Sequence, residues 1–110
     1  MKKLILIGFC LLLATAALAH PPKDIKLKVD GTKLEVVVIH PVGENKLHFI
    51  DKIEVSVNGK KLIKQTFLVQ GNENEQKAIY LIPSLKKEDI VKVSANCNKY
   101  GDKSMIITIE

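Results

Sequence analysis

Few residues in this chain could bind a transition metal. Most of them lie at expected strand ends or loops. Besides Cys10 near the N-terminus, the soft ligands are three histidines and one cysteine: His20, His40, His48 and Cys97. Imidazole nitrogen and thiolate sulfur bind iron, copper and zinc well. None of these residues has the close spacing of a C-x-x-C or H-E-x-x-H motif, so a site would form only if the fold gathered them. Taken singly, each histidine is more often a polar loop residue, and Cys97 a small buried one.

Other kinds of chemistry have little support in the sequence. It contains no Gly-rich phosphate loop, no serine in a nucleophile elbow and no paired carboxylates on an obvious common face. The 17 basic residues are all lysines, and aromatic residues make up 5% of the chain. Nucleic-acid binders commonly use arginine forks and aromatic stacking, so this composition argues against a nucleic-acid partner. Asp51 and Glu54 lie near His48 in the sequence and could orient its ring, although solvated strand positions are their more common role.

The N-terminal segment has the pattern of a secretion signal. A charged start is followed by the apolar run Leu4–Leu13 and by small residues that end in Ala17-Leu18-Ala19, an A-x-A cleavage pattern. Cleavage would divide the chain into a signal peptide, residues 1–19, and one mature domain, residues 20–110. Removing 19 of the 110 residues leaves 91, and losing two lysines lowers the net charge from +5 to +3. We therefore predict a periplasmic or secreted protein that is not anchored in a membrane.

The predicted cleavage leaves a single cysteine, because Cys10 departs with the signal. Cys97 then cannot form a disulfide within the chain. A lone thiol in an oxidising compartment is explained by burial, by a bond to another chain, or by a metal. The sequence leaves these three alternatives open.

Apolar alternation and β-branched runs predict seven strands and no convincing helix. Asn58-Gly59 is a strong hairpin signal, the step from Ile50 to Ile53 suggests a β-bulge, and Lys86–Asp89 is at most one helical turn. Seven short antiparallel strands in about 90 residues favour an all-β, immunoglobulin-like sandwich. In such a sandwich the strand ends gather at two rims, where distant residues can converge on one metal. The predicted strands span residues 25–29, 34–39, 48–57, 61–69, 78–82, 90–95 and 105–109.

Several motifs together resemble a known family, the iron-binding domain of desulfoferrodoxin and the one-iron superoxide reductases (neelaredoxins). The most specific are His40-Pro41, His48-Phe49-Ile50 and Cys97-Asn98-Lys99-Tyr100-Gly101, and the resemblance covers nearly all of residues 20–110. It implies a seven-stranded immunoglobulin-like sandwich with a mononuclear non-haem iron bound by four histidines and an axial cysteine. The implied activity is the one-electron reduction of superoxide to hydrogen peroxide.

The resemblance also assigns roles residue by residue. Cys97 corresponds to the axial ligand, His40 and His48 to two equatorial ligands, and His20 to the first histidine of the family. Tyr100 stands where the family has its fourth histidine. That departure leaves open a missing ligand, a phenolate ligand, another metal or none.

Two further features differ from the family pattern. The glutamate and lysine that precede the family's first histidine have no counterpart here, so Lys23 or Lys46 is the candidate guide for the superoxide anion. No four-cysteine segment is present, which leaves only a one-iron form. The electron donor is not indicated by the sequence, and exposed edge strands leave room for a homo-oligomer.

Two other hypotheses on function stand beside that of a superoxide reductase. Cleavage after Ala19 would give His20 a free amino group, and an N-terminal histidine favours copper, so a non-catalytic module that binds copper or iron is the alternative. The third reading is a sandwich that has lost its site, with Cys97 buried and inert.

Overall fold

The computed structural model describes residues 21–110, and these residues form seven β-strands and no helix. The predicted signal segment 1–19 and His20 lie outside the described residues. No helix within the described range is long and apolar enough to cross a membrane. The strands are β1 (Asp24–Asp30), β2 (Lys33–Ile39), β3 (Ile50–Val57), β4 (Lys60–Thr66), β5 (Glu75–Leu81), β6 (Ile90–Cys97) and β7 (Asp102–Thr108).

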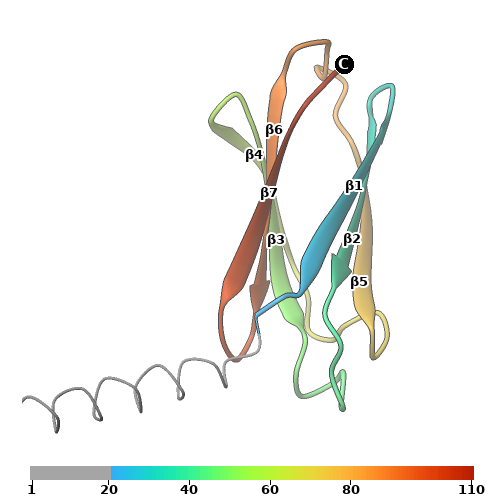
Figure 1. The fold of residues 1–110 in the computed structure, drawn as a ribbon, viewed down its shortest axis with the longest axis vertical. Coiled ribbons are helices and arrows are strands. Elements are labelled where there is room, and N and C mark those ends of the chain that lie inside the picture. The colour runs from blue at the N-terminus through green and yellow to red at the C-terminus, as the bar shows by residue number, and fades with distance from the viewer. Residues whose placement is uncertain (1–20) are drawn as a thin grey trace, which may run out of the picture.

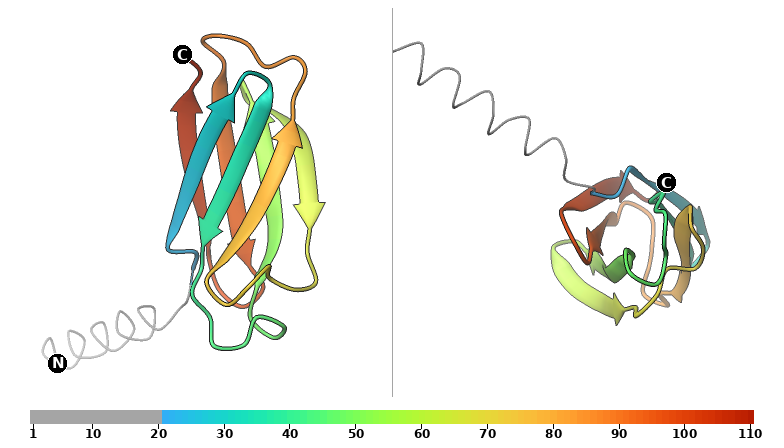
Figure 2. Two further views of the ribbon diagram at one scale, coloured as in Figure 1. Left: turned by 90° about the vertical axis from the view of Figure 1, so that its right-hand side faces the viewer. Right: turned by 90° about the horizontal axis from the view of Figure 1, so that it is seen from below.

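The strands form two antiparallel sheets that face each other as a sandwich (Figures 1 and 2). One sheet has the order β1-β2-β5, and the other has the order β4-β3-β6-β7. This arrangement confirms the predicted all-β sandwich of seven strands. At the edge of the sandwich, β1 approaches β7 of the opposite sheet.

The core consists of the apolar side chains that alternate toward the space between the sheets. In β2, Leu34, Val36 and Val38 are fully buried, whereas their neighbours along the strand are only partly covered. This period of two is the physical basis of the strand predictions, because successive side chains of a strand point to opposite faces. Strands β1, β3 and β6 and the loop before β6 complete the buried core with Ile25, Ile50, Ile53, Val55, Ile82, Leu85, Val91, Val93 and Ala95.

Local backbone signals account for the turns. Asn58 and Gly59 both have positive φ angles, 51° and 83°, as a tight turn between β3 and β4 requires. The pairing of β3 with β6 shifts register between Ile50 and Lys52, which confirms the predicted bulge. A second shift, between Val55 and Ser56 in the pairing with β4, was not predicted.

Several strand boundaries differ from the predicted ones. The differences arise where polar residues join the strand pairing and where the chain forms a turn in place of a predicted strand end. The strand predicted to start at His48 starts at Ile50, because the backbone N–H of His48 donates to Glu44 O in a tight turn (2.9 Å). The strand predicted over 61–69 ends at Thr66, before the buried Gln70. β5 begins three residues before the predicted start, since Glu75 already pairs with Ile39.

One end of the sandwich collects the loops that carry the candidate ligands. The start of β1 pairs with the end of β2 (Asp24 with Ile39), and the start of β3 pairs with the end of β6 (Ile50 with Cys97). The β2–β3, β4–β5 and β6–β7 connections therefore meet at this end, the lower end in Figure 1.

Candidate metal centre

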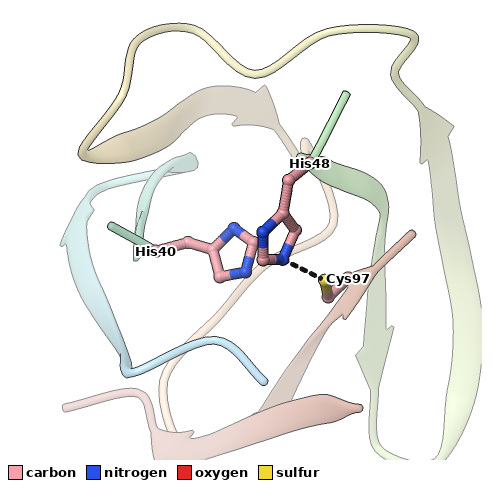
Figure 3. A group of neighbouring side chains, drawn as sticks. All are labelled: His40, His48 and Cys97. Atoms are coloured by element: carbon pink, nitrogen blue, oxygen red, sulfur yellow. Dashed lines mark hydrogen bonds between the residues drawn. The ribbon is translucent and has the colours of Figure 1, made fainter. Parts of the chain in front are cut away.

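Three of the predicted ligands meet at this end of the sandwich. His40 follows β2, His48 lies in the loop before β3, and Cys97 is the last residue of β6. One ligand atom from each lies within 4.8 Å of the other two (Figure 3). The structure thus brings these three side chains together at the strand ends.

The contacts inside the cluster are close. His48 Nε2 lies 3.0 Å from Cys97 Sγ, within hydrogen-bond distance. The rings of His40 and His48 meet edge to face, with centroids 4.8 Å apart and planes at 88°. His40 is 1% exposed and Cys97 3% exposed, whereas His48 is only partly buried. The cluster therefore has a buried interior side and one ligand closer to solvent.

A buried glutamine that sequence reasoning missed supports His40. Gln70 Oε1 lies 2.7 Å from His40 Nδ1, and Gln70 Nε2 donates to the backbone oxygen of His40 (2.8 Å). The side chain of Gln70 is 1% exposed. A glutamine in a loop, 30 positions from the histidine it touches, has no local sequence signal that would have identified it.

The loops around the cluster are held to each other by asparagines. Asn45 donates to Gln70 O (2.9 Å) and accepts from Gln70 N through its own backbone oxygen (3.1 Å). Asn98 donates to Leu47 O (3.0 Å) and accepts from Phe49 N (2.9 Å). These bonds connect the His48 loop to the Gln70 loop on one side and to the Cys97 turn on the other.

The turn after Cys97 provides a donor for the sulfur. The backbone N–H of Lys99 points to Cys97 Sγ at 3.4 Å. The N–H of Cys97 itself donates to Gly101 O (3.0 Å), which closes the turn. A backbone donor of this kind stabilises a thiolate, the form in which cysteine binds metals.

The donor set fits a transition-metal ion. Two imidazoles and a thiolate suit zinc, copper and iron, and not magnesium or calcium, which prefer oxygen ligands. Donors bound to one ion at about 2.0–2.3 Å lie no more than about 4.6 Å apart. The observed separations, all within 4.8 Å, need only a slight closing of the cluster.

The other predicted site residues lie near this end or outside the described range. His20 is outside it. Tyr100 is 60% exposed and lines a shallow hollow with Asn98 and Lys99. Lys23 and Lys46 are both exposed on the segments that lead to β1 and to His48.

The carboxylates suggested as supports for His48 have other partners. Asp51 accepts from the side chain of Asn96 (2.9 Å). Glu54 forms ion pairs with Lys61 and Lys52, and the hydrogen bond from Lys61 is the main cause that holds the pKa of Glu54 below its ordinary value. Glu54 thus pairs with lysines on the outer face of its sheet, where its side chain is only 18% exposed.

Comparison with known proteins supports the fold but provides no sequence relative. No protein-family model matches the sequence, and no curated protein matches it. Among solved structures, the chain is similar to a superoxide reductase (1Fe-SOR) from Giardia intestinalis, with a TM-score of 0.62 and 19% sequence identity. The match covers 83% of this chain and 98% of that one. The described residues thus share the fold of a one-iron superoxide reductase and place a His/His/Cys cluster at one end of it.

Proposed function

We propose that this protein binds a mononuclear non-haem iron and reduces superoxide to hydrogen peroxide by one electron. The observation that carries the proposal is the convergence of His40, His48 and Cys97 at one end of a superoxide-reductase-like sandwich. The ligand set consists of these three residues and His20, with Tyr100 in the position of a fourth histidine.

The inclusion of His20 is supported by the path of the residues that follow it. A Cβ atom on Gly101 would lie 2.7 Å from Pro21 Cβ, so the start of the described chain packs against the turn that follows Cys97. Lys23 N donates to Ile39 O (2.8 Å), directly before His40. The described chain therefore begins beside the cluster, and His20 is the residue that precedes it in the sequence.

The protein's own groups have distinct roles in this proposal. A ferrous ion bound here would supply the electron, which an unidentified donor must return after each turnover, and solvent would supply two protons. The Cys97 thiolate would hold the ion and donate electron density to it, and the Lys99 N–H would stabilise the charge on the sulfur. Lys23 and Lys46 would raise the local concentration of the superoxide anion.

The deciding experiment is anaerobic reconstitution of the purified protein with ferrous iron. We expect about one iron per chain, a thiolate-to-iron absorption band after oxidation that Cys97→Ser abolishes, and consumption of superoxide in the absence of any dismutase. Iron binding without superoxide consumption would refute the reductase activity. Failure to bind iron would refute the iron centre.

Copper binding without catalysis is the second candidate, and the described ligand set is the observation that favours it. The cluster contains two histidines and one cysteine, which are also the ligands of blue-copper centres. Competition between the two metals in one sample distinguishes the candidates. A stoichiometric copper complex that survives an excess of ferrous iron and loses affinity in His20→Ala would support the copper module.

We also propose that the protein is exported and that cleavage follows Ala19. The A-x-A pattern and the short apolar run before it support this proposal. The intact mass of the protein recovered from the periplasm or the medium tests it, since cleavage leaves His20 as the first residue. A mass that retains residues 1–19 would refute it.

A further inference from the structure

Gln70 occupies a position where all of its polar groups are bound. Its side-chain oxygen accepts from Ile50 N (3.1 Å) and faces His40 Nδ1, while its nitrogen donates to the backbone oxygens of His40 (2.8 Å) and Asn72 (2.9 Å). Three segments therefore converge on one buried amide: the end of β2, the start of β3 and the loop before β5.

The backbone groups around this amide determine which of its two ends faces His40. Ile50 N–H is a donor and requires the oxygen beside it, whereas the two carbonyl oxygens require the amide nitrogen. A flipped amide would place its NH₂ group against the Ile50 donor and its oxygen against both carbonyls. The orientation is thus set by three backbone groups, independently of the histidine.

The orientation of the amide dictates the protonation of the ring. Because Gln70 Oε1 can only accept, His40 Nδ1 must carry the proton of this 2.7 Å hydrogen bond. In a neutral imidazole the other nitrogen, Nε2, then carries the lone pair, and the ring of His40 extends toward His48 and Cys97 (Figure 3). That nitrogen is then the unprotonated one, the form in which an imidazole binds a metal.

We propose that Gln70 is a positioning residue, which holds His40 as the Nδ1–H tautomer and aims its Nε2 at the metal. The inference rests on the metal centre proposed above. Its physical basis is that a histidine ligand whose second nitrogen donates to a fixed acceptor has its tautomer and ring orientation set before the metal binds. The backbone of His40 is held as well, since its N–H donates to Asn74 O (2.9 Å) and its oxygen accepts from Gln70.

The first test reads the tautomer directly in metal-free wild-type protein. Long-range proton–nitrogen NMR spectra of protein labelled at the histidine nitrogens distinguish Nδ1–H from Nε2–H rings, and His40→Ala identifies the signals of His40. The spectra are recorded at a pH where the ring is neutral. We expect a single Nδ1–H tautomer, and an Nε2–H ring or a mixture would overturn the inference.

The second test measures affinity for cobalt(II), a coloured probe ion, in competition with a chelator. Gln70→Met removes the acceptor and should weaken binding by about 10- to 100-fold, the usual effect of losing the partner of a histidine ligand. Gln70→Glu keeps an oxygen opposite Nδ1 and should keep the tautomer and most of the affinity, although it loses the two hydrogen bonds to the carbonyls of His40 and Asn72 and should be less stable. If neither variant folds, the tautomer of the wild-type ring still decides the inference.

The matched control is Gln76→Met. Gln76 is also buried, 8% exposed, and also bonds to backbone groups, accepting from Gly71 N and donating to Lys77 O. Its loss should alter stability but neither the His40 tautomer nor cobalt affinity. Equal weakening by Gln70→Met and Gln76→Met would overturn the positioning role.

The two tests separate this inference from the proposed metal centre. If wild-type protein shows the Nδ1–H tautomer but binds neither cobalt nor iron, the proposed metal centre is refuted. The role of Gln70 in metal binding is then refuted as well, because there is no metal for His40 to bind. If wild-type protein binds metal and Gln70→Met binds it equally well, only the role of Gln70 is refuted.

Discussion

His48 Nε2 lies 3.0 Å from Cys97 Sγ although the two residues are 49 positions apart. The pairing of Ile50 with Cys97 at the start of β3 and the end of β6 produces this contact, because it places the loop before β3 directly beside the last residue of β6. Asn98 strengthens the junction through its bonds to Leu47 and Phe49. The sheet itself thus brings together two of the three side chains in the described cluster.

Replacing either member of this pair should impair metal binding. We expect Cys97→Ser to abolish the thiolate charge-transfer band of the cobalt complex. His48→Ala should weaken cobalt binding by more than the about 10- to 100-fold expected for a supporting residue. Chelator competition monitored by absorbance measures both effects.

Leu47→Ala is the control for this pair, because Leu47 is the neighbour of His48 and its side chain is 68% exposed. It should leave the spectrum and the affinity unchanged. A cobalt complex with the same band in Cys97→Ser would show that the thiolate is not a ligand.

Gly101→Ala should disturb the approach of the N-terminal segment to the site. Gly101 has a φ of 80°, and an added Cβ would meet Pro21 at 2.7 Å. Gly59 has a similar φ of 83° but open space around it. Gly59→Ala therefore isolates the backbone strain, about 1–3 kcal/mol, whereas Gly101→Ala adds a steric clash.

Chemical unfolding should show a larger loss of stability in Gly101→Ala than in Gly59→Ala. If His20 is a ligand, Gly101→Ala alone should also weaken metal binding, because it displaces the adjacent Pro21. Equal effects of both substitutions on stability would contradict the close packing of Pro21 on Gly101.

Asp89 should contribute stability that disappears in acid. It is 4% exposed, and hydrogen bonds from the side chain of Asn58 (2.9 Å) and the backbone N–H of Lys86 (2.9 Å) hold its pKa below the ordinary value. Because the folded pKa is lowered, the contribution is complete above the unfolded pKa, about 3.9, and is lost as pH falls through the folded value.

Asp89→Asn should consequently be less stable than wild type at pH 7, and the difference should shrink below about pH 4, where the carboxyl of the unfolded chain takes up a proton while the folded one still resists it. Urea unfolding at the two pH values measures this. Glu88→Gln, at the exposed neighbouring position, should show no such change. A difference between Asp89→Asn and wild type that stays constant across this range would argue against the lowered pKa.

Core packing should depend on Ile53 and hardly at all on Ile79. Ile53 in β3 is fully buried, whereas Ile79 on the outer face of β5 is 61% exposed. Ile53→Ala should cost about 2–5 kcal/mol through lost burial and the cavity left behind. Ile79→Ala should change stability by no more than about 0.5 kcal/mol. Denaturant unfolding compares the two, and similar losses would be inconsistent with the sandwich core described above.

Much of the fold was predictable because strands and tight turns follow local rules. The alternation in Leu34, Val36 and Val38 indicates one buried face, and the pair Asn58-Gly59 predicts the hairpin that the structure contains. The strand ends were less predictable. Gln76 is polar, yet it pairs within β5 and is buried, so the strand starts where tertiary hydrogen bonds permit and not where apolar residues begin.

The candidate site, like the fold, was predictable from the sequence only in part. Residue type alone marked His40, His48 and Cys97 as ligands, because imidazole and thiolate are the groups that bind transition metals. Their convergence and the role of Gln70 depended on the tertiary structure. Contacts such as His40 with Gln70, 30 positions apart, and His48 with Cys97 arise only when strands distant in sequence pair and bring their ends to one rim. A local sequence pattern carries the chemistry of each side chain, whereas the distances between them are decided by long-range pairing and packing.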